Sequence, residues 1–291
     1  MKQPLVSIYI PTKNRPELLL RAISSCLSQS YQDLEIIVVD DGSDQQATEV
    51  IQQIATLDPR IVILRNDVSL GACAARNLAI NAATGEFITG LDDDDEFTSD
   101  RIANFVAAWS LNPDLSFLSS GYKVIQRDGY YSYACRQRYI SFDDLLYANY
   151  VGNQIFTRTE YLLCIAGFDV NMSSCQDYDV WIRLSQRFGS GYRLNQISYI
   201  VHQEHESPRI SHGPKNSEGY RLLIQKHRSY MSDAQYRSQL FYQVLNTEQW
   251  SCLRLLALAG RRNIVIALKN IAFRYYFALK NIFTIPSFKQ H

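Results

Sequence analysis

The sequence predicts an α/β fold, built on a mostly parallel sheet that has helices on both of its faces. Two observations indicate this fold. Apolar, β-branched runs bounded by turn residues alternate with helix-length segments through the first third of the chain, as in parallel strands joined by crossover helices. Hydrophobic residues make up 46% of the 291 residues, which is enough for a sizeable core and too many for a disordered chain.

The first elements follow one another closely along the chain. We expect strands over residues 5–10, 34–39, 60–64 and 86–91, and helices over residues 17–28, 44–57 and 72–83. Ser43 or Asp44 can cap the second helix, because short polar side chains accept hydrogen bonds from the first helical amides. After residue 98 the pattern loosens into a helix over 100–111 and a strand over 115–120. Beyond residue 218 we expect helix to the end, with a break at Pro286.

Charge and cysteine usage exclude several classes of protein. The chain has 29 Lys and Arg against 29 Asp and Glu, so its balance gives no reason to propose a nucleic acid as partner. The six cysteines lie far apart and form no CxxC pair, which indicates neither a zinc site nor a redox motif. The N-terminus shows no cleavable signal pattern, and no run approaches the roughly 18 apolar residues of a spanning helix. We therefore expect a cytoplasmic protein.

Carboxylates follow two of the predicted strands. Asp40 and Asp41 end one strand, and the run from Asp92 to Glu96 ends another. Both groups could open onto one crevice, because open parallel sheets bind ligands at the carboxyl ends of their strands. A divalent cation would relieve the repulsion among five adjacent acids, and oxygen ligands suit Mg²⁺ or Mn²⁺. The alternative is a solvated loop or the start of a helix, and Asp95 and Glu96 are expected to begin the next helix.

Four motifs occur in order along the first hundred residues. They are Pro11-Thr12-Lys13-Asn14-Arg15, Asp40-Asp41-Gly42-Ser43, a segment from Ala75-Arg76-Asn77 to Phe87-Ile88, and the acidic run. Over about residues 4–215 the chain resembles the inverting family 2 glycosyltransferases of the GT-A fold. The resemblance implies a GT-A catalytic domain over 1–217, with a nucleotide-sugar-binding half over 1–97 and an acceptor-binding half over 98–217. A helical extension over 218–291 would follow.

The resemblance also implies which residues hold the donor. The family's Pro-Thr-x-Asn-Arg segment and the second Asp of its Asp-Asp-Gly-Ser turn hold the nucleoside, usually uridine, and here they match Pro11, Thr12, Asn14, Arg15 and Asp41. Family members often stack an aromatic side chain on the base just before the motif's Asn. This chain has Lys13 there, which leaves the base open.

The family's Asp-x-Asp element matches Asp92-Asp93-Asp94. Asp94 is the predicted metal ligand, and Asp92 is expected nearer the ribose and the metal waters, with Asp93 also at the donor. Arg76 lies on the helix that precedes the acidic strand. It would contact the crevice carboxylates or the donor, and the alternative is an ordinary structural salt bridge.

The segment Gln176-Asp177-Tyr178-Asp179 resembles the family's Glu-Asp-Tyr-Asp element, whose first Asp points at the acceptor. Asp177 is therefore predicted to be the base that takes the proton from the acceptor hydroxyl. Gln176 departs from the family's Glu and removes one charge. The alternative for Asp177 is a helix N-cap.

Two further expectations concern the same predicted helix. Trp181 and Leu184 are spaced as one helix face and are expected in the core. Arg183 is expected to pair with Asp179 at i,i+4.

Residues 200–211 resemble the family's closing loop, which brings a His to the metal and a basic residue to the diphosphate. The candidates are His205 and Arg209, and His202 is the competing histidine. An arginine suits an anionic leaving group, because its guanidinium forms bidentate hydrogen bonds.

The last segment, residues 249–291, has no acidic residue. It carries many apolar residues and the cations Arg254, Arg261, Arg262, Lys269, Arg274, Lys280 and Lys289. Basic amphipathic helices of this composition bind anionic membrane surfaces. The alternative is a helix that packs on the catalytic domain or on a partner.

These features predict an inverting, hexosyltransferase-type enzyme with Mn²⁺ or Mg²⁺ as cofactor. The resemblance implies a UDP-sugar donor, a saccharide or lipid-linked saccharide acceptor, and a place in bacterial surface polysaccharide synthesis such as that of O-antigen. Peripheral attachment to the inner face of the cell membrane is expected. A sugar nucleotidyltransferase is disfavoured, because its N-terminal Gly-rich loop is absent. A non-catalytic nucleotide-binding or scaffold subunit of a polysaccharide assembly complex stays open.

Overall fold

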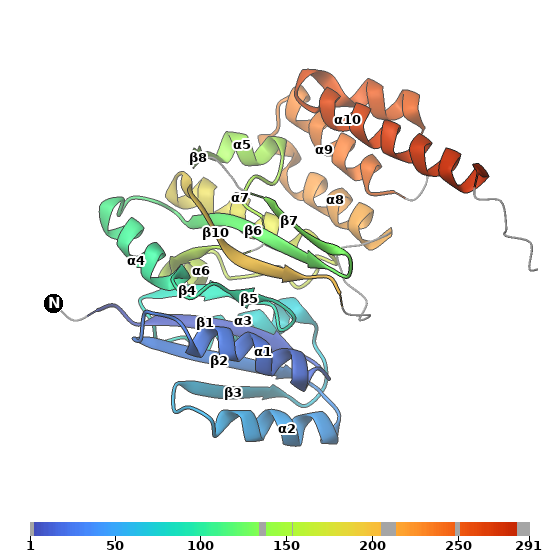
Figure 1. The fold of residues 1–291 in the computed structure, drawn as a ribbon. Helices are drawn as coiled ribbons and strands as arrows, with labels where there is room; N and C mark the ends of the chain where they lie inside the picture. Colours follow the sequence, from blue (N-terminus) through green and yellow to red (C-terminus); the bar gives the residue numbers. More distant parts are fainter. Residues whose placement is uncertain (1–2, 134–137, 153, 205–213, 248–250, 284–291) are drawn as a thin grey trace, which may run out of the picture. The chain divides into compact units, whose positions relative to one another are not determined.

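The computed structural model describes residues 3–133, 138–152, 154–204, 214–247 and 251–283 (Figure 1). The chain forms two compact units, the first of residues 1–145 and 149–209 and the second of residues 146–148 and 210–291. The functional division after residue 217, and the division of the first part after residue 97, stay predictions.

The first unit is built on one sheet, whose first half is parallel. Its strands β3 (Ile61–Asn66), β2 (Leu34–Asp41), β1 (Val6–Thr12) and β4 (Phe87–Gly90) lie in that order and run in one direction. The carboxyl ends of β2 and β4 therefore lie on either side of β1, at the same edge of the sheet (Figure 1).

The second half of the sheet is mixed. Strand β9 (Phe156–Arg158) is antiparallel to β4, β6 (Leu118–Gln126) is antiparallel to β9, and β10 (Gly191–His202) is parallel to β6. The short strand β5 (Glu96–Phe97) pairs with β10, so Glu96 lies in a strand. The expectation that Glu96 begins a helix was wrong, because the next helix, α4 (Arg101–Leu111), begins five residues later. The remaining strands, β7 (Gly129–Tyr133) and β8 (Arg138–Ile140), pair with β6 and β10.

Helices cover both faces of the parallel half, as predicted. Alternate β1 residues such as Ile8 share a core cluster with Leu19 and Ile23 of α1 (Pro16–Leu27). On the opposite face α3 (Ala72–Ala82) contacts β1 and β2. The carboxylate of Asp44 caps α2 (Gln45–Ala55) by accepting a hydrogen bond from the Ala47 amide, which is one of the two predicted caps.

Three further helices belong wholly or in part to this unit, namely α5 (Phe142–Tyr147), α6 (Thr159–Cys164) and α7 (Gln176–Phe188). Trp181 and Leu184 of α7 are fully buried, which confirms the core prediction. Arg183 Nε lies 2.8 Å from Asp179 Oδ2, which confirms the predicted i,i+4 pair. Arg183 also donates to the main-chain carbonyls of Ile165 and Gly167, and these hydrogen bonds stabilise the turn after α6.

The second unit is helical where it is described, as predicted. It contains α8 (Pro214–His227), the 3₁₀ turn η1 (Arg228–Tyr230), α9 (Asp233–Leu245) and α10 (Cys252–Phe283). Its core joins Phe241 and Val244 of α9 to Leu255, Ala259 and Ala267 of α10. Pro286 lies outside the described residues. Within the described part of the chain, no helix combines the length and the apolar composition that crossing a bilayer requires.

Candidate active site

The carboxylates that follow β4 face different partners. Asp93 accepts a hydrogen bond of 2.7 Å from the Thr12 hydroxyl and lies 3.2 Å from Arg15 Nη1, which also lies 3.4 Å from Asp94. Asp95 is buried and accepts a 3.0 Å hydrogen bond from the main-chain amide of His202. Burial raises the pKa of Asp93 to about 7, against the opposing effects of Arg15 and Thr12. Asp93 and Asp95 thus each accept hydrogen bonds from protein groups.

Asp92 is the most open side chain of the Asp92–Asp94 element, with 33% of its side-chain surface exposed against 9% for Asp93 and 11% for Asp94. Its Oδ1 accepts hydrogen bonds from Arg76 at 3.0 Å and from Gln154 at 3.4 Å. Exposure of this kind leaves Asp92 accessible to a ligand from solvent.

The missing side chain of Gly90 makes room for Gln154 and the Tyr9 ring. A Cβ at this position would lie 2.3 Å from Gln154 Oε1 and 2.4 Å from the Tyr9 ring, so no larger residue fits without a shift. The Tyr9 hydroxyl in turn donates to Gln154 Oε1 at 3.3 Å. Gln154 is therefore oriented toward Asp92 by a residue of the central strand.

Arg76 is a buried cation between two carboxylates. Its Nη2 bonds to Asp92, its guanidinium lies 5.2 Å from the centre of the Phe168 ring, and its Nε and Nη1 have no hydrogen-bond partner among the described residues. Burial by itself would lower the pKa of Arg76, but the charges of Asp177 and Asp92 outweigh it and raise the pKa. Arg76 thus contacts a carboxylate of the acidic run, and its contact with the donor stays a prediction.

Asp177 lies in the first turn of α7. The residue at the N-cap position is Cys175, in a left-handed conformation with φ of 58°, and its side chain makes no capping hydrogen bond. The N-cap alternative for Asp177 was therefore wrong. Asp177 Oδ1 is shielded from solvent and accepts no hydrogen bond in the described part of the chain. Burial raises the pKa of Asp177 to about 6, opposed by the charge of Arg76 and reinforced by that of Asp92.

Asp41 has a different environment. Its two oxygens accept hydrogen bonds of 2.7 to 2.9 Å from the side chains of Asn66 and Ser69 and from the amides of Leu70 and Gly71. Burial would raise the pKa of Asp41, but these four donors hold it below its usual value. Gly71 has φ of 90° and precedes α3, so Asp41 fixes the turn from which the Arg76 helix starts. A direct contact of Asp41 with a nucleoside stays a prediction.

Asn14 joins two loops at the same edge of the sheet. The main-chain N–H of Asn14 donates to the Ser43 hydroxyl at 2.9 Å, and its side-chain Oδ1 accepts from the main-chain N–H of Asp44 at 2.8 Å. Asn14 has φ of 54°, a conformation that Asn tolerates better than most residues. Pro11 and Thr12 end β1, and Thr12 and Arg15 contact Asp93 of the acidic run.

His202 is held by two carboxylates. Its Nε2 lies 2.6 Å from Glu96 and its Nδ1 lies 2.6 Å from Glu204. Arg21 of α1 reaches Glu96 at 3.7 Å and Glu204 at 3.5 Å, and it donates to the main-chain carbonyl of Asp94 at 2.7 Å. Both ring nitrogens of His202 are therefore engaged. The other two candidates of the closing loop, His205 and Arg209, lie outside the described residues.

Gln154 and Arg21 were missed by the sequence interpretation. Gln154 follows a loop without regular pattern, and Arg21 lies on a helix whose spacing indicates only amphipathicity. Both act through contacts with residues that are more than 60 positions away in the chain, and a single sequence carries no signal for such contacts.

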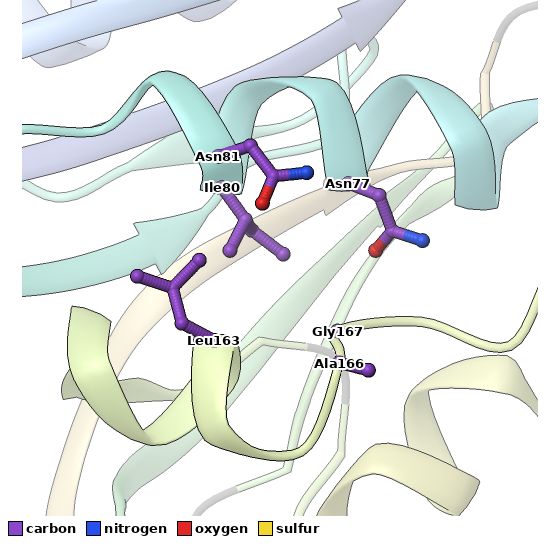
Figure 2. Close-up of a pocket in the computed structure, with 6 residues that line it drawn as sticks. All are labelled: Asn77, Ile80, Asn81, Leu163, Ala166 and Gly167. Carbon is purple, nitrogen blue, oxygen red and sulfur yellow. The ribbon is translucent and has the colours of Figure 1, made fainter.

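A cavity of about 280 Å³ lies between α3 and the end of α6. Figure 2 shows Asn77, Ile80 and Asn81 of α3 on one side and Leu163, Ala166 and Gly167 on the other. Asn77 bonds to both the amide and the carbonyl of Phe168, and a Cβ on Gly167 would lie 2.3 Å from Asn77 Oδ1. This packing fixes the turn that places the Phe168 ring against Arg76.

Comparisons with known proteins agree on one family. The sequence model described as Glycosyl transferase family 2 matches residues 7–162. The chain is 38% identical to WcaA of Escherichia coli K12, a glycosyl transferase named for colanic acid biosynthesis, over 89% of this chain and 95% of that protein. It is 31% identical to the uncharacterized glycosyltransferase MJ1057 of Methanocaldococcus jannaschii, over 79% of this chain and 78% of that protein.

Solved structures share the fold at low identity. The structure of S. aureus TarS 1-349 in complex with UDP-GlcNAc superposes with a TM-score of 0.64 at 15% identity, covering 94% of this chain and 92% of that one. The mannosyltransferase PcManGT from Pyrobaculum calidifontis, in complex with GDP-Man and Mn²⁺, gives 0.62 at 16% identity, covering 96% and 81%. With the GT-A fold of these enzymes and the family sequence match over more than half of its length, this chain belongs to glycosyl transferase family 2.

Proposed function

We propose that this glycosyltransferase moves a sugar with inversion, in one displacement step. The observation that carries the proposal is the buried carboxylate of Asp177, whose Oδ1 has no hydrogen-bond donor among the described residues and whose charge interacts with Arg76, the cation that binds Asp92. Asp177 takes the proton from the acceptor hydroxyl as its oxygen attacks the anomeric carbon. The nucleoside diphosphate leaves from the opposite side of the sugar. A base placed in this way contributes about 10² to 10⁴-fold in rate.

The proposed metal site is built from Asp94 and Asp92. The described residues contain no group of three His, Cys, Asp or Glu side chains placed to hold a metal ion by themselves. Mg²⁺ and Mn²⁺ at a nucleotide-sugar are commonly held by one or two carboxylates together with substrate phosphates. When bound, the ion supplies positive charge to the departing diphosphate. His205 is the proposed additional ligand, and Arg209 is proposed to bind the diphosphate.

The proposed donor is a UDP-sugar. Pro11, Thr12, Asn14 and Arg15 form the nucleoside side of the crevice, together with the loop that Asp41 fixes, and Asp93 and Arg76 complete the donor site. The TarS complex with UDP-GlcNAc supports uridine, whereas the PcManGT complex contains GDP-Man, so the fold alone accommodates either base. The experiment below therefore tests which nucleobase the enzyme binds.

The proposed acceptor is a saccharide or a lipid-linked saccharide in bacterial surface polysaccharide synthesis, such as that of O-antigen. The similarity to WcaA, which is named for colanic acid, supports this class of pathway. The proposal includes peripheral attachment through residues 249–291 to the inner face of the cell membrane, because lipid-linked acceptors lie at that face.

A thermal-shift screen tests the proposal. UDP- and GDP-sugars are added with Mn²⁺, with Mg²⁺ or with a chelator, and donor hydrolysis is followed by release of the nucleoside diphosphate. A donor at about 100 times its Kd stabilises by about 2.7 kcal/mol, which is several degrees for a protein of this size. Metal-dependent stabilisation with hydrolysis is expected. Stabilisation without any hydrolysis would favour the non-catalytic subunit, and no stabilisation by any donor would overturn the proposal.

A further inference from the structure

The last helix exposes large apolar side chains on one face. At Gly260 the backbone has φ of 55° and ψ of −170°, which interrupts α10, and the helix continues from Arg261. Ile264, Val265 and Leu268 are 37%, 57% and 53% exposed. Their spacing of three and four residues places them on one side of the helix. We name these three residues the exposed α10 face.

The orientation of α10 is fixed by its opposite side. Asn263 is buried there, and it donates to the Ser238 hydroxyl at 2.8 Å and accepts from the Tyr242 hydroxyl at 3.4 Å. Ala267, one turn further on, is fully buried in the core shared with α9. Rotating α10 to bury its larger apolar residues would take the Asn263 amide away from both partners, which is costly for a buried polar group. The helix therefore presents its small and polar residues inward and its large apolar residues outward.

The charged residues of α10 itself are all cations. Arg261 and Lys269 are exposed and flank it, and residues 249–291 contain no acidic residue. An apolar strip between cations, with no acid along the whole segment, is typical of a helix that lies in the interface of an anionic bilayer. A protein partner with an apolar groove would not require every acid to be absent. Charge complementarity thus favours lipid as the occupant.

We propose that the exposed α10 face binds an anionic membrane surface. Ile264, Val265 and Leu268 enter the boundary between headgroups and acyl chains, and Arg261 and Lys269 contact lipid phosphates. Each such cation contributes roughly fivefold in binding at low salt. The inference deepens the peripheral attachment in the proposed function. It rests on that function only for the location of the acceptor, because vesicle binding and donor turnover are measured separately.

Vesicle co-sedimentation of the full chain tests the proposal. Phosphatidylcholine vesicles are compared with vesicles that also contain phosphatidylglycerol, at low and high salt. The double variant Val265→Glu/Leu268→Glu removes the apolar strip, and Arg261→Glu/Lys269→Glu reverses the flanking charges. Leu111→Glu is the matched control, because Leu111 is an apolar residue of α4 that is 82% exposed. All five residues changed by these variants are exposed, so the variants are expected to fold, which circular dichroism checks.

The wild-type chain should bind only the anionic vesicles and should release them at high salt. Both double variants should bind at least tenfold more weakly, while Leu111→Glu binds like the wild type. Equal binding by Val265→Glu/Leu268→Glu, or no binding of the wild type at low salt, would overturn the proposal. A wild-type dimer that dissociates in that variant, without vesicle binding, would instead assign the face to a second copy. Donor hydrolysis without vesicles reports on the proposed function independently of these results.

Discussion

The carboxylates that follow β2 and those that follow β4 lie at the same edge of one parallel sheet, yet the protein uses them differently. Asp41, after β2, has four hydrogen-bond donors from its own chain, and its neighbour Asp40 pairs with Arg65 and with the Ser43 amide. Asp92, after β4, has one-third of its side-chain surface exposed. The charge of Asp177 on α7 interacts with those of Arg76 and Asp92, and its Oδ1 accepts no hydrogen bond among the described residues.

The pKa values follow the same division. Hydrogen bonds hold the pKa of Asp41 below its usual value, whereas burial raises the pKa of Asp177 to about 6. A carboxylate whose acceptor sites are filled by the protein stabilises a loop and has little capacity left for a ligand. A carboxylate that is buried without donors is less stable as an anion, and it gains by accepting a proton. The first kind holds loops in place, and the second kind has the environment expected of the proposed base.

The largest effect is expected from removing the base. Asp177→Asn should lower sugar transfer, measured by acceptor-dependent release of the nucleoside diphosphate, by about 10² to 10⁴-fold. The shape of the side chain is kept, but its ability to take the acceptor proton is lost. Asp128→Asn, in the exposed turn between β6 and β7, is the matched control and should transfer normally. Full activity in Asp177→Asn would remove this residue from the mechanism.

Replacing Asp41, the carboxylate whose oxygens are occupied by protein donors, should lower the stability of the protein. In Asp41→Asn one oxygen becomes an N–H donor that must face the donors of the 66–71 loop. We expect a loss of about 1 to 3 kcal/mol in the free energy of unfolding, measured in urea at pH 7. Because the native pKa of Asp41 is lowered, its stabilising effect is present at neutral pH and is lost as pH falls through that pKa. The difference between variant and wild type should therefore shrink in acid. An unchanged unfolding midpoint at pH 7 would contradict the structural role of Asp41.

For Asp177→Asn, the free energy of unfolding at pH 7 should change in the opposite direction. Its pKa is raised in the folded protein, so the charged form destabilises above about pH 6, and this penalty disappears as the group is protonated at lower pH. Asp177→Asn should be more stable than the wild type at pH 7 by on the order of 3 kcal/mol, the free energy that corresponds to a rise in pKa from 3.8 to about 6. The gain should shrink as pH falls below about 6 and should be gone only below the ordinary carboxyl pKa of 3.8. A variant that is less stable at pH 7 would show that Asp177 has unrecognised donors.

A smaller effect is expected from Arg21, which supports the acidic run through the Asp94 carbonyl. Arg21→Ala should raise the Mn²⁺ concentration for half-maximal activity by about threefold, the loss expected for one hydrogen bond of ordinary strength. Arg21→Lys should recover part of it. A fall in melting temperature without any change in metal requirement would assign Arg21 a purely structural role.

The sequence predicted the parts of this fold that depend on local pattern. The strands that lead to Asp41 and toward Asp92 and the core face of α7 follow from residue spacing, and residue type narrowed the cap of α2 to Ser43 or Asp44. The order β4-β9-β6 in the mixed half could not be predicted, because it depends on pairing between distant short strands. The four donors around Asp41 and the approach of Gln154 to Asp92 are long-range contacts of the same kind.

The tail shows the same limit. Its composition indicated a basic, apolar helix, but which side would be exposed depends on the partners that Asn263 finds on α9.

The division of labour between the two sites is tested most directly by calorimetric titration of a nucleotide-sugar into Asp177→Asn and Asp94→Asn, each with Mn²⁺. If Asp177 acts only on the acceptor and Asp94 holds the metal against the donor, the Kd of Asp177→Asn stays within about twofold of the wild type, while Asp94→Asn binds at least tenfold more weakly. Full metal-dependent affinity in Asp94→Asn, or lost affinity in Asp177→Asn, would contradict the account.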